Sequence, residues 1–250
     1  MATTAEPGGS ASTPRKRKPA GPFAGAIPIA VIGLIGTAIG FFPTFFSRLG
    51  EVDFAHLVHG WTMTGWLLVV LVQATLIRQR QYKWHRVLGW SSIVMFVAMF
   101  ASSWQMLVLM LSGQTHLPFE MAKFFGWTDI IDMPLILFLY GGAIYWRKDR
   151  HLHSRLVATT VLTTIVPALA RMFNILIWRS LEGLYLAMHP TYILILGVLA
   201  AAIWVDHKNG VLRWPLPLVF GWFVLDYVTL WPVATSQWYD GLARAIASLA

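Results

Sequence analysis

The 250-residue sequence contains no cysteine, so disulfide bonds and thiolate metal sites are excluded, and any metal must be held by His, Asp, Glu or Met. Charged residues make up only 12% of the chain, against roughly 25% in an ordinary soluble domain. A phosphate-binding glycine loop, a Ser-His-Asp spacing and a His-Glu-x-x-His motif are also missing, which counts against the commoner enzyme classes. No lysine follows Lys208, so the last apolar run cannot form the Schiff base of a retinal protein.

Apolar and aromatic residues are abundant instead. Hydrophobic residues form 57% of the chain, the mean hydropathy is +0.61, and there are 13 Trp and 15 Phe residues. Such aromatic content is typical of belts at the two lipid–water boundaries of a membrane protein. The net charge of +8 comes mostly from short loops between apolar runs, which the positive-inside rule explains better than nucleic-acid binding does. We therefore expect a lipid bilayer as partner and no nucleic acid.

Seven apolar runs follow one another, each near the roughly 20 residues that cross a bilayer as a helix. They lie at about 22–46, 54–77, 86–111, 128–146, 154–178, 184–204 and 214–233. The sequence thus predicts an all-α integral membrane seven-helix bundle over residues 22–233. Residues 1–21 are small, polar and basic and are predicted to be a disordered tail, while residues 234–250 are predicted to be a short amphipathic tail. The first run is too long for a signal peptide and no small-residue cleavage site follows it, so we expect it to be retained.

The basic residues orient this bundle. The connections after the second, fourth and sixth runs, at 78–86, 147–155 and 206–213, are rich in Arg, Lys and His. The opposite connections hold little more than Arg48, Lys123 and Arg179. Because basic loops stay on the cytoplasmic side, the N-terminus is predicted to be cytoplasmic and the C-terminus to lie on the outer side.

Polar pairs at i,i+3 spacing occur near the outer ends of three predicted helices. They are His56/His59, Asp129/Asp132 and Arg171/Asn174. Residues at this spacing share one helix face, and facing helices of carboxylate-bridged bundles supply metal ligands in this way. The sequence therefore predicts a metal site near the outer surface, with ligands His56, His59, His189 and Asp129, and with Asp132 as a further ligand or a base. Imidazole and carboxylate without thiolate favour Zn, Cu or Fe, or a b-type haem.

Simpler roles are open for the same residues. Histidine and aspartate at helix ends can extend to water, and Asp53 or Asp129 can cap a helix N-terminus. Asp132 and His189 lie deeper in their runs, where capping explains them less well. His116, with Glu120 four residues on, is expected to form a solvated pair in a loop.

Arg171 lies within the fifth apolar run, where a guanidinium needs a carboxylate or an anionic ligand. Together with Asn174 it is predicted to form an ion pair, with Asp132 or Asp226 as the partner, or to bind an anionic group. Asp226 lies near the middle of the last run and either pairs with Arg171 or relays protons. Asp132 and Asp226 are accordingly the predicted catalytic carboxylates.

Four histidines, His85, His151, His153 and His207, lie at the opposite, basic ends of the runs. Head-group anchoring is one role for them. The other is a haem on the inner side, with His85 and His153 as axial ligands from different helices. A histidine level in each half of the membrane resembles, in outline, the plan of cytochrome b561-like proteins, although His85 and His153 are flanked by arginines at the lipid surface.

A second resemblance rests on His56, Trp66, the basic turn at Arg78 and the start of the next run at His85-Arg-Val-Leu-Gly89. These features, with His153-Ser-Arg155-Leu156 and the segment ending at Arg171, resemble a group of uncharacterised bacterial polytopic membrane proteins over about residues 53–175. The resemblance implies a multi-pass protein of the bacterial inner membrane, with its outer side facing the periplasm. It implies no particular activity.

The leading interpretation is an inner-membrane metalloprotein whose His/Asp metal or haem site near the periplasmic face serves a redox or hydrolytic reaction on a lipid-soluble or periplasmic substrate. One alternative is a non-catalytic assembly factor or subunit of a larger membrane complex, with other membrane proteins or further copies of the chain as partners. A third is a proton-coupled transporter that uses Asp226, Arg171 and the outer cluster as its pathway.

Overall fold

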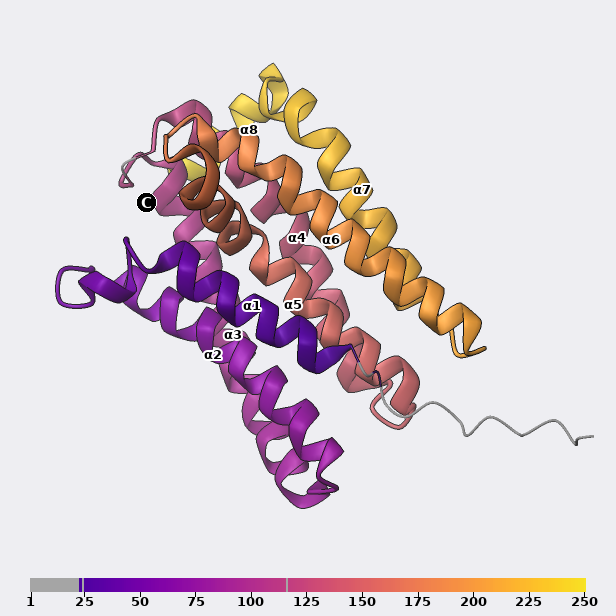
Figure 1. Ribbon diagram of the computed structural model, residues 1–250. Coiled ribbons are helices and arrows are strands. Elements are labelled where there is room, and N and C mark those ends of the chain that lie inside the picture. Colours follow the sequence, from indigo (N-terminus) through magenta and orange to yellow (C-terminus); the bar gives the residue numbers. More distant parts are fainter. Residues whose placement is uncertain (1–22, 24, 116) are drawn as a thin grey trace, which may run out of the picture.

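The computed structural model describes residues 23, 25–115 and 117–250 as a bundle of long helices (Figure 1). The predicted tail at 1–21 and His116 lie outside the described residues. Within the described ranges the elements are helices and no strand occurs. They are α1 (Ala26–Phe41), η1 (Phe46–Arg48), α2 (Phe54–Arg78), α3 (Tyr82–Leu111), α4 (Phe119–Tyr145), α5 (Arg150–Phe173), the π-helical turn η2 (Asn174–Trp178), α6 (Gly183–Lys208), α7 (Pro215–Ala234) and α8 (Gln237–Ala247).

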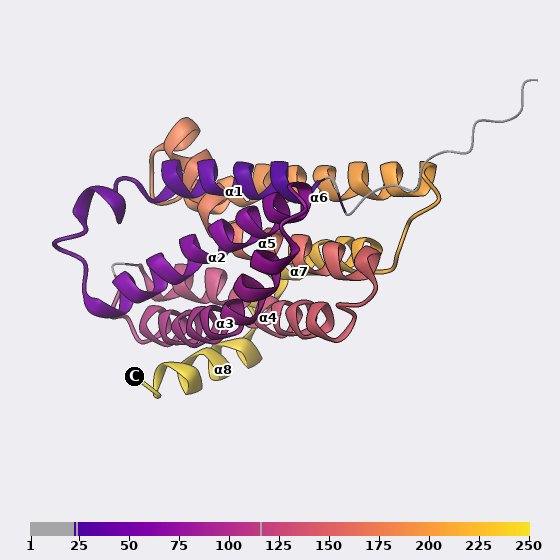
Figure 2. The ribbon, with the colours of Figure 1, turned by 90° about the horizontal axis from the view of Figure 1, so that it is seen from below.

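Helix α5 occupies the centre of the bundle. It packs against α1, α2, α4, α6 and α7, and most of its side chains from Arg155 to Ala170 are buried. Helices α2 and α3 form one antiparallel hairpin and α6 and α7 form another, and the two hairpins diverge on either side of α5 (Figure 1). Helices α1 and α8 lie on opposite faces of the bundle (Figure 2). Helix α7 also packs directly against α4 and α6, so polar groups on these helices can meet beside the central helix.

Helix α1 approaches α5 closely at Gly40. A Cβ atom built on Gly40 would lie 2.3 Å from the carbonyl oxygen of Ala168, so the two backbones touch there. Small residues permit this kind of contact between helices in a bilayer, where packing rather than water drives association. The contact also places Phe41, the last residue of α1, over the side chain of Arg171 on α5.

Among the described residues, six helices are long and apolar enough to cross a membrane, which makes the protein a multi-pass helical membrane protein. They are α2, α3, α4, the α5–η2 segment, α6 and α7. Helix α1 is apolar but has only 16 residues. The expected boundaries hold within a few residues except for α4, which begins at Phe119 rather than near residue 128.

The early start of α4 corrects the role expected for Asp129. That residue lies inside the helix, so it cannot be the N-cap that the sequence allowed. Asp53 does cap α2: its carboxylate accepts hydrogen bonds from the backbone N–H of His56 at 3.0 Å and from the ring Nδ1 of His56 at 2.6 Å. The backbone hydrogen bond is the main reason why the pKa of Asp53 lies below its ordinary value.

The amphipathic end of the chain forms α8, which packs against α3 and α4. Its buried face consists of Tyr239, Ala243 and Ile246. The hydroxyl group of Tyr239 donates to the carbonyl oxygen of Lys123, and Asp240 accepts a hydrogen bond from the Lys123 ammonium group at 2.9 Å. Burial raises the pKa of Tyr239. Helix α8 thereby covers the first turns of α4.

Candidate functional site in the bundle interior

Asp226 is the most enclosed acidic residue in the described part of the chain. It lies on α7 and its relative exposure is 0%. The hydroxyl group of Tyr192 on α6 donates a hydrogen bond to its Oδ2 atom, while Oδ1 is buried without a partner. A buried carboxyl group with half of its hydrogen-bonding capacity unmet is costly, and inside a membrane it indicates a functional role.

Asp132 on α4 faces the same interior. Its relative exposure is 8%, and its Oδ1 atom is buried without a hydrogen-bond partner. The charges of Asp226 and Asp129 act on it, and the indole of Trp222 lies beside it, although the indole Nε1 completes no hydrogen bond of normal geometry. A hydrogen bond of 3.1 Å from Trp127 to Thr229 holds α4 and α7 together near this level.

Three carboxyl groups from two helices thus interact electrostatically in the bundle interior, those of Asp129, Asp132 and Asp226. We call them the acidic cluster. Like charges that interact in a medium of low dielectric constant cannot all be ionised cheaply. Such groups hold a proton or bind a cation, and they can release it when the surroundings change. The two predicted catalytic carboxylates, Asp132 and Asp226, are therefore brought together.

Arg171 does not form the ion pair that the sequence predicts. Within the ranges that the structure describes, neither Asp132 nor Asp226 lies within the 4.0 Å of an ion pair with it. Its Nη1 atom donates one long hydrogen bond, of 3.4 Å, to the Pro167 carbonyl oxygen, and its guanidinium lies 4.6 Å from the ring centre of Phe41. Its companion Asn174 has a buried Oδ1 atom without a partner.

The predicted outer metal ligands are not assembled. His56 is bonded to Asp53, and the Nδ1 atom of His59 lies 3.4 Å from the Ser102 hydroxyl group. His189 on α6 instead bonds to Tyr227 at 2.7 Å and stacks on Trp231 with ring centres 4.8 Å apart. Among the described residues, no group of three or more His, Asp or Glu side chains is placed to hold a metal ion. Of the four predicted ligands, His56 and His59 lie on α2, His189 lies on α6 and Asp129 lies on α4, and the metal site expected from them stays a prediction.

The two inner histidines do meet. The rings of His85 on α3 and His153 on α5 lie edge to face with centres 6.2 Å apart. The Nδ1 atom of His153 lies 2.8 Å from the carbonyl oxygen of Ala143. The other ring nitrogen of His153, Nε2, takes no part in this contact. The Nδ1 atom of His85 is buried and has no hydrogen-bond partner.

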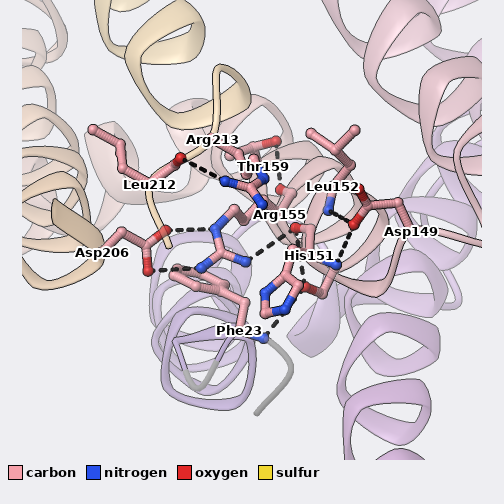
Figure 3. A network of polar contacts seen from close by, with 10 residues as sticks. Phe23, Asp149, His151, Leu152, Arg155, Thr159, Asp206, Leu212 and Arg213 are labelled. Atoms are coloured by element: carbon pink, nitrogen blue, oxygen red, sulfur yellow. Dashed lines mark hydrogen bonds and ion pairs between the residues drawn. The ribbon is translucent and has the colours of Figure 1, made fainter. Parts of the chain in front are cut away.

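A second buried polar contact, which the sequence did not reveal, lies near the N-terminal end of α5 (Figure 3). Arg155 on α5 donates to both carboxylate oxygens of Asp206 on α6, at 2.5 and 2.7 Å. Its Nη1 atom donates to the His151 carbonyl oxygen, and the Phe23 ring lies 5.5 Å from the guanidinium. Both charged side chains are almost fully buried, so this pair joins the two helices and differs from the solvated loop residues that the sequence suggested.

Sequence reasoning also missed Tyr192, the partner of Asp226. Its signal was present: Tyr192 follows His189 by three residues, so both lie on one face of α6, and that face meets α7 through Asp226 and Tyr227. A tyrosine in an apolar run does not by itself indicate a polar partner.

Fold and site together define a polytopic helical membrane protein with ionisable groups enclosed between its helices. Comparison of the chain with protein-family models, with curated proteins and with solved structures found no match.

Proposed function

We propose that the protein is a proton-coupled membrane transporter, in which Asp132 and Asp226 take up and release the coupling proton. The observation that carries this proposal is the burial of both carboxyl groups, each with an oxygen atom that has no partner. Protonation neutralises such a carboxyl group where no fixed counter-charge is present. The charge of the group changes when the proton binds or leaves, and this change favours different packing of the surrounding helices.

The proposal includes the membrane arrangement. Helix α1 is taken as the first of seven spans, with the N-terminus in the cytoplasm and the C-terminus in the periplasm of a bacterial inner membrane. The basic connections at 78–86, 147–155 and 206–213 support this orientation, since all three follow even-numbered spans. Other membrane proteins or further copies of the chain are the partners that the exposed apolar helix faces would accept.

Currents from proteoliposomes adsorbed on a solid-supported membrane test the proposal without knowledge of the solute. A rapid drop in external pH drives protons into the bundle, and their movement toward buried carboxylates displaces charge. The wild-type protein is expected to give a transient current that Asp132→Asn and Asp226→Asn each reduce strongly. Asp240→Asn on α8 is the matched control and is expected to keep the current. A wild-type signal equal to that of empty liposomes would contradict the proposal and favour a structural role.

A redox function is a second candidate, and the approach of His85 and His153 favours it. Metal-ligating histidines usually donate their other ring N–H to a carbonyl or carboxylate group, and His153 is placed to donate to Ala143 in this way. The imidazoles of His85 and His153, on different helices, could hold a b-type haem or a divalent metal ion on the inner side. Purified protein with a Soret band that is lost in His85→Ala and His153→Ala would support this candidate, and colourless protein without bound metal would exclude it.

A further inference from the structure

Arg171 lies in the last turn of α5, and its guanidinium forms no ion pair with the described residues. The residue is partly exposed, and Phe41 of α1 covers its guanidinium at 4.6 Å. A guanidinium has five N–H donors, yet the only hydrogen bond it makes to the described residues is the 3.4 Å contact with Pro167. A cation in a membrane-spanning helix ordinarily has a counter-charge or an anionic ligand. Donors are therefore available on this partly exposed charged group.

The carboxylate that acts most on Arg171 is Asp129 of α4. It is close enough for the two charges to interact, but it is farther away than the 4.0 Å of an ion pair. Of the other helices packed against α5, α2 contributes His59, whose imidazole is influenced by the charge of Arg171. The outer halves of α6 and α7 carry His189 and Asp226, which are bonded to Tyr227 and Tyr192. Helix α1 and turn η2 contain no titratable residue.

We propose that Arg171 binds the oxyanion group of the transported solute, and that Asp129 controls this binding by competing for the same guanidinium. With Asp129 ionised, part of the positive charge of Arg171 is neutralised and an approaching anion is repelled. With Asp129 protonated, the guanidinium is free to donate two parallel hydrogen bonds to a carboxylate or phosphate group. The solute and the proton then bind together. This inference rests on the proposed transport function and names its substrate class.

Asp129 is suited to this linkage because it also belongs to the acidic cluster. The charge of Asp129 interacts with Asp132, and the charge of Asp226 interacts with Asp129. A proton that reaches the cluster therefore lowers the negative charge facing Arg171, and an anion at Arg171 favours retention of that proton. By thermodynamic linkage the two affinities change by the same factor.

Anion binding to the full-length protein in a phosphate-free detergent tests the inference. The probe is inorganic phosphate, followed by isothermal calorimetry at acidic and at alkaline pH. The wild-type protein is expected to bind phosphate more tightly at acidic pH. Arg171→Gln and Arg171→Lys are expected to bind about tenfold more weakly, since charge-assisted bidentate contacts are lost. Arg179→Gln, which removes an exposed arginine near the same end, is the control and is expected to bind like the wild type.

Asp129→Asn supplies the decisive variant, because a gain of binding cannot result from misfolding. It is expected to bind phosphate at alkaline pH as tightly as the wild type does at acidic pH. Unchanged pH dependence in Asp129→Asn, or wild-type binding by Arg171→Gln, would overturn the inference. If phosphatidylglycerol stabilises the protein through Arg171 while inorganic phosphate does not bind, the ligand is a lipid head group and the linkage to transport is wrong. Proton currents that still depend on Asp226 in that case would leave the proposed function intact.

Discussion

Arg155 and Asp206 form a two-point ion pair between α5 and α6, with both side chains almost completely buried. The pair lies near the N-terminal end of α5, beside the Phe23 ring (Figure 3). The acidic cluster lies on two other helices, α4 and α7. The N-terminal end of α5 and the C-terminal end of α6 are therefore fixed to each other, away from the groups proposed to act in transport.

Breaking this pair from one side is expected to destabilise the protein strongly. Arg155→Met leaves the Asp206 carboxylate buried without a counter-charge, and the expected loss is about 3–5 kcal/mol. The double variant Arg155→Met/Asp206→Leu removes both charges and is expected to recover much of that loss. Thermal unfolding in detergent measures both. A double variant as unstable as the single one would show that the contact contributes by shape rather than by charge.

The hydrogen bond from Tyr192 to Asp226 is expected to stabilise the contact between α6 and α7. Tyr192→Phe keeps the ring and removes the donor, which leaves both carboxyl oxygens without a partner. The expected loss of stability is roughly 1–3 kcal/mol, measured by thermal unfolding. Tyr145→Phe is the control because Tyr145 is 75% exposed. Equal melting temperatures for the two variants would argue against a stabilising role for the Tyr192 hydroxyl group.

The close approach of α1 and α5 predicts a sharp difference between two glycines. Gly40→Ala would place a Cβ atom 2.3 Å from the Ala168 carbonyl oxygen, so the helices must separate. We expect a loss of about 1–3 kcal/mol. Gly141→Ala is the matched change on α4, where a Cβ atom meets nothing within 4 Å, and it is expected to be neutral or slightly stabilising. If Gly40→Ala leaves the stability of the protein unchanged, α1 does not pack on α5 as described.

The docking of α8 is expected to weaken in acid. Hydrogen bonds from Lys123 and Arg244 hold the pKa of Asp240 below its ordinary value of 3.8. Because the folded-state pKa is the lower one, the stabilising contribution is present above pH 3.8 and is lost as the pH falls through the lowered value. Fluorescence of Trp238 during acid titration reports the release of α8. In Asp240→Asn this acid-dependent step should be missing, and an unchanged titration would contradict the assignment.

Much of the fold could be predicted from the sequence because each crossing helix is a long apolar run bounded by charged or turn residues. The start of α4 could not, since Glu120 and Lys123 made that segment resemble a loop. Lys123 is in fact buried and paired with Glu120 and with Asp240 of α8, a residue far along the chain. Hydropathy cannot anticipate a charge that is neutralised by a distant helix.

The candidate site was predictable by residue type and less so by partner. Asp132, Asp226 and Arg171 stood out because ionisable groups are rare in apolar runs. Their partners depend on how each helix is rotated about its axis, which a sequence with apolar residues on every face does not specify. The expected ion pair of Arg171 with Asp132 or Asp226 did not form for this reason, whereas the juxtaposition of His85 and His153 followed from their places at the starts of α3 and α5.

Infrared difference spectroscopy after a pH jump tests the central claim most directly, because a protonated carboxyl group inside a membrane protein has its own carbonyl stretching band. The wild-type protein is predicted to show such a band, with separate losses in Asp132→Asn and Asp226→Asn and no loss in Asp240→Asn. A spectrum that lacks the band, or keeps it unchanged in both interior variants, would contradict proton exchange at the acidic cluster.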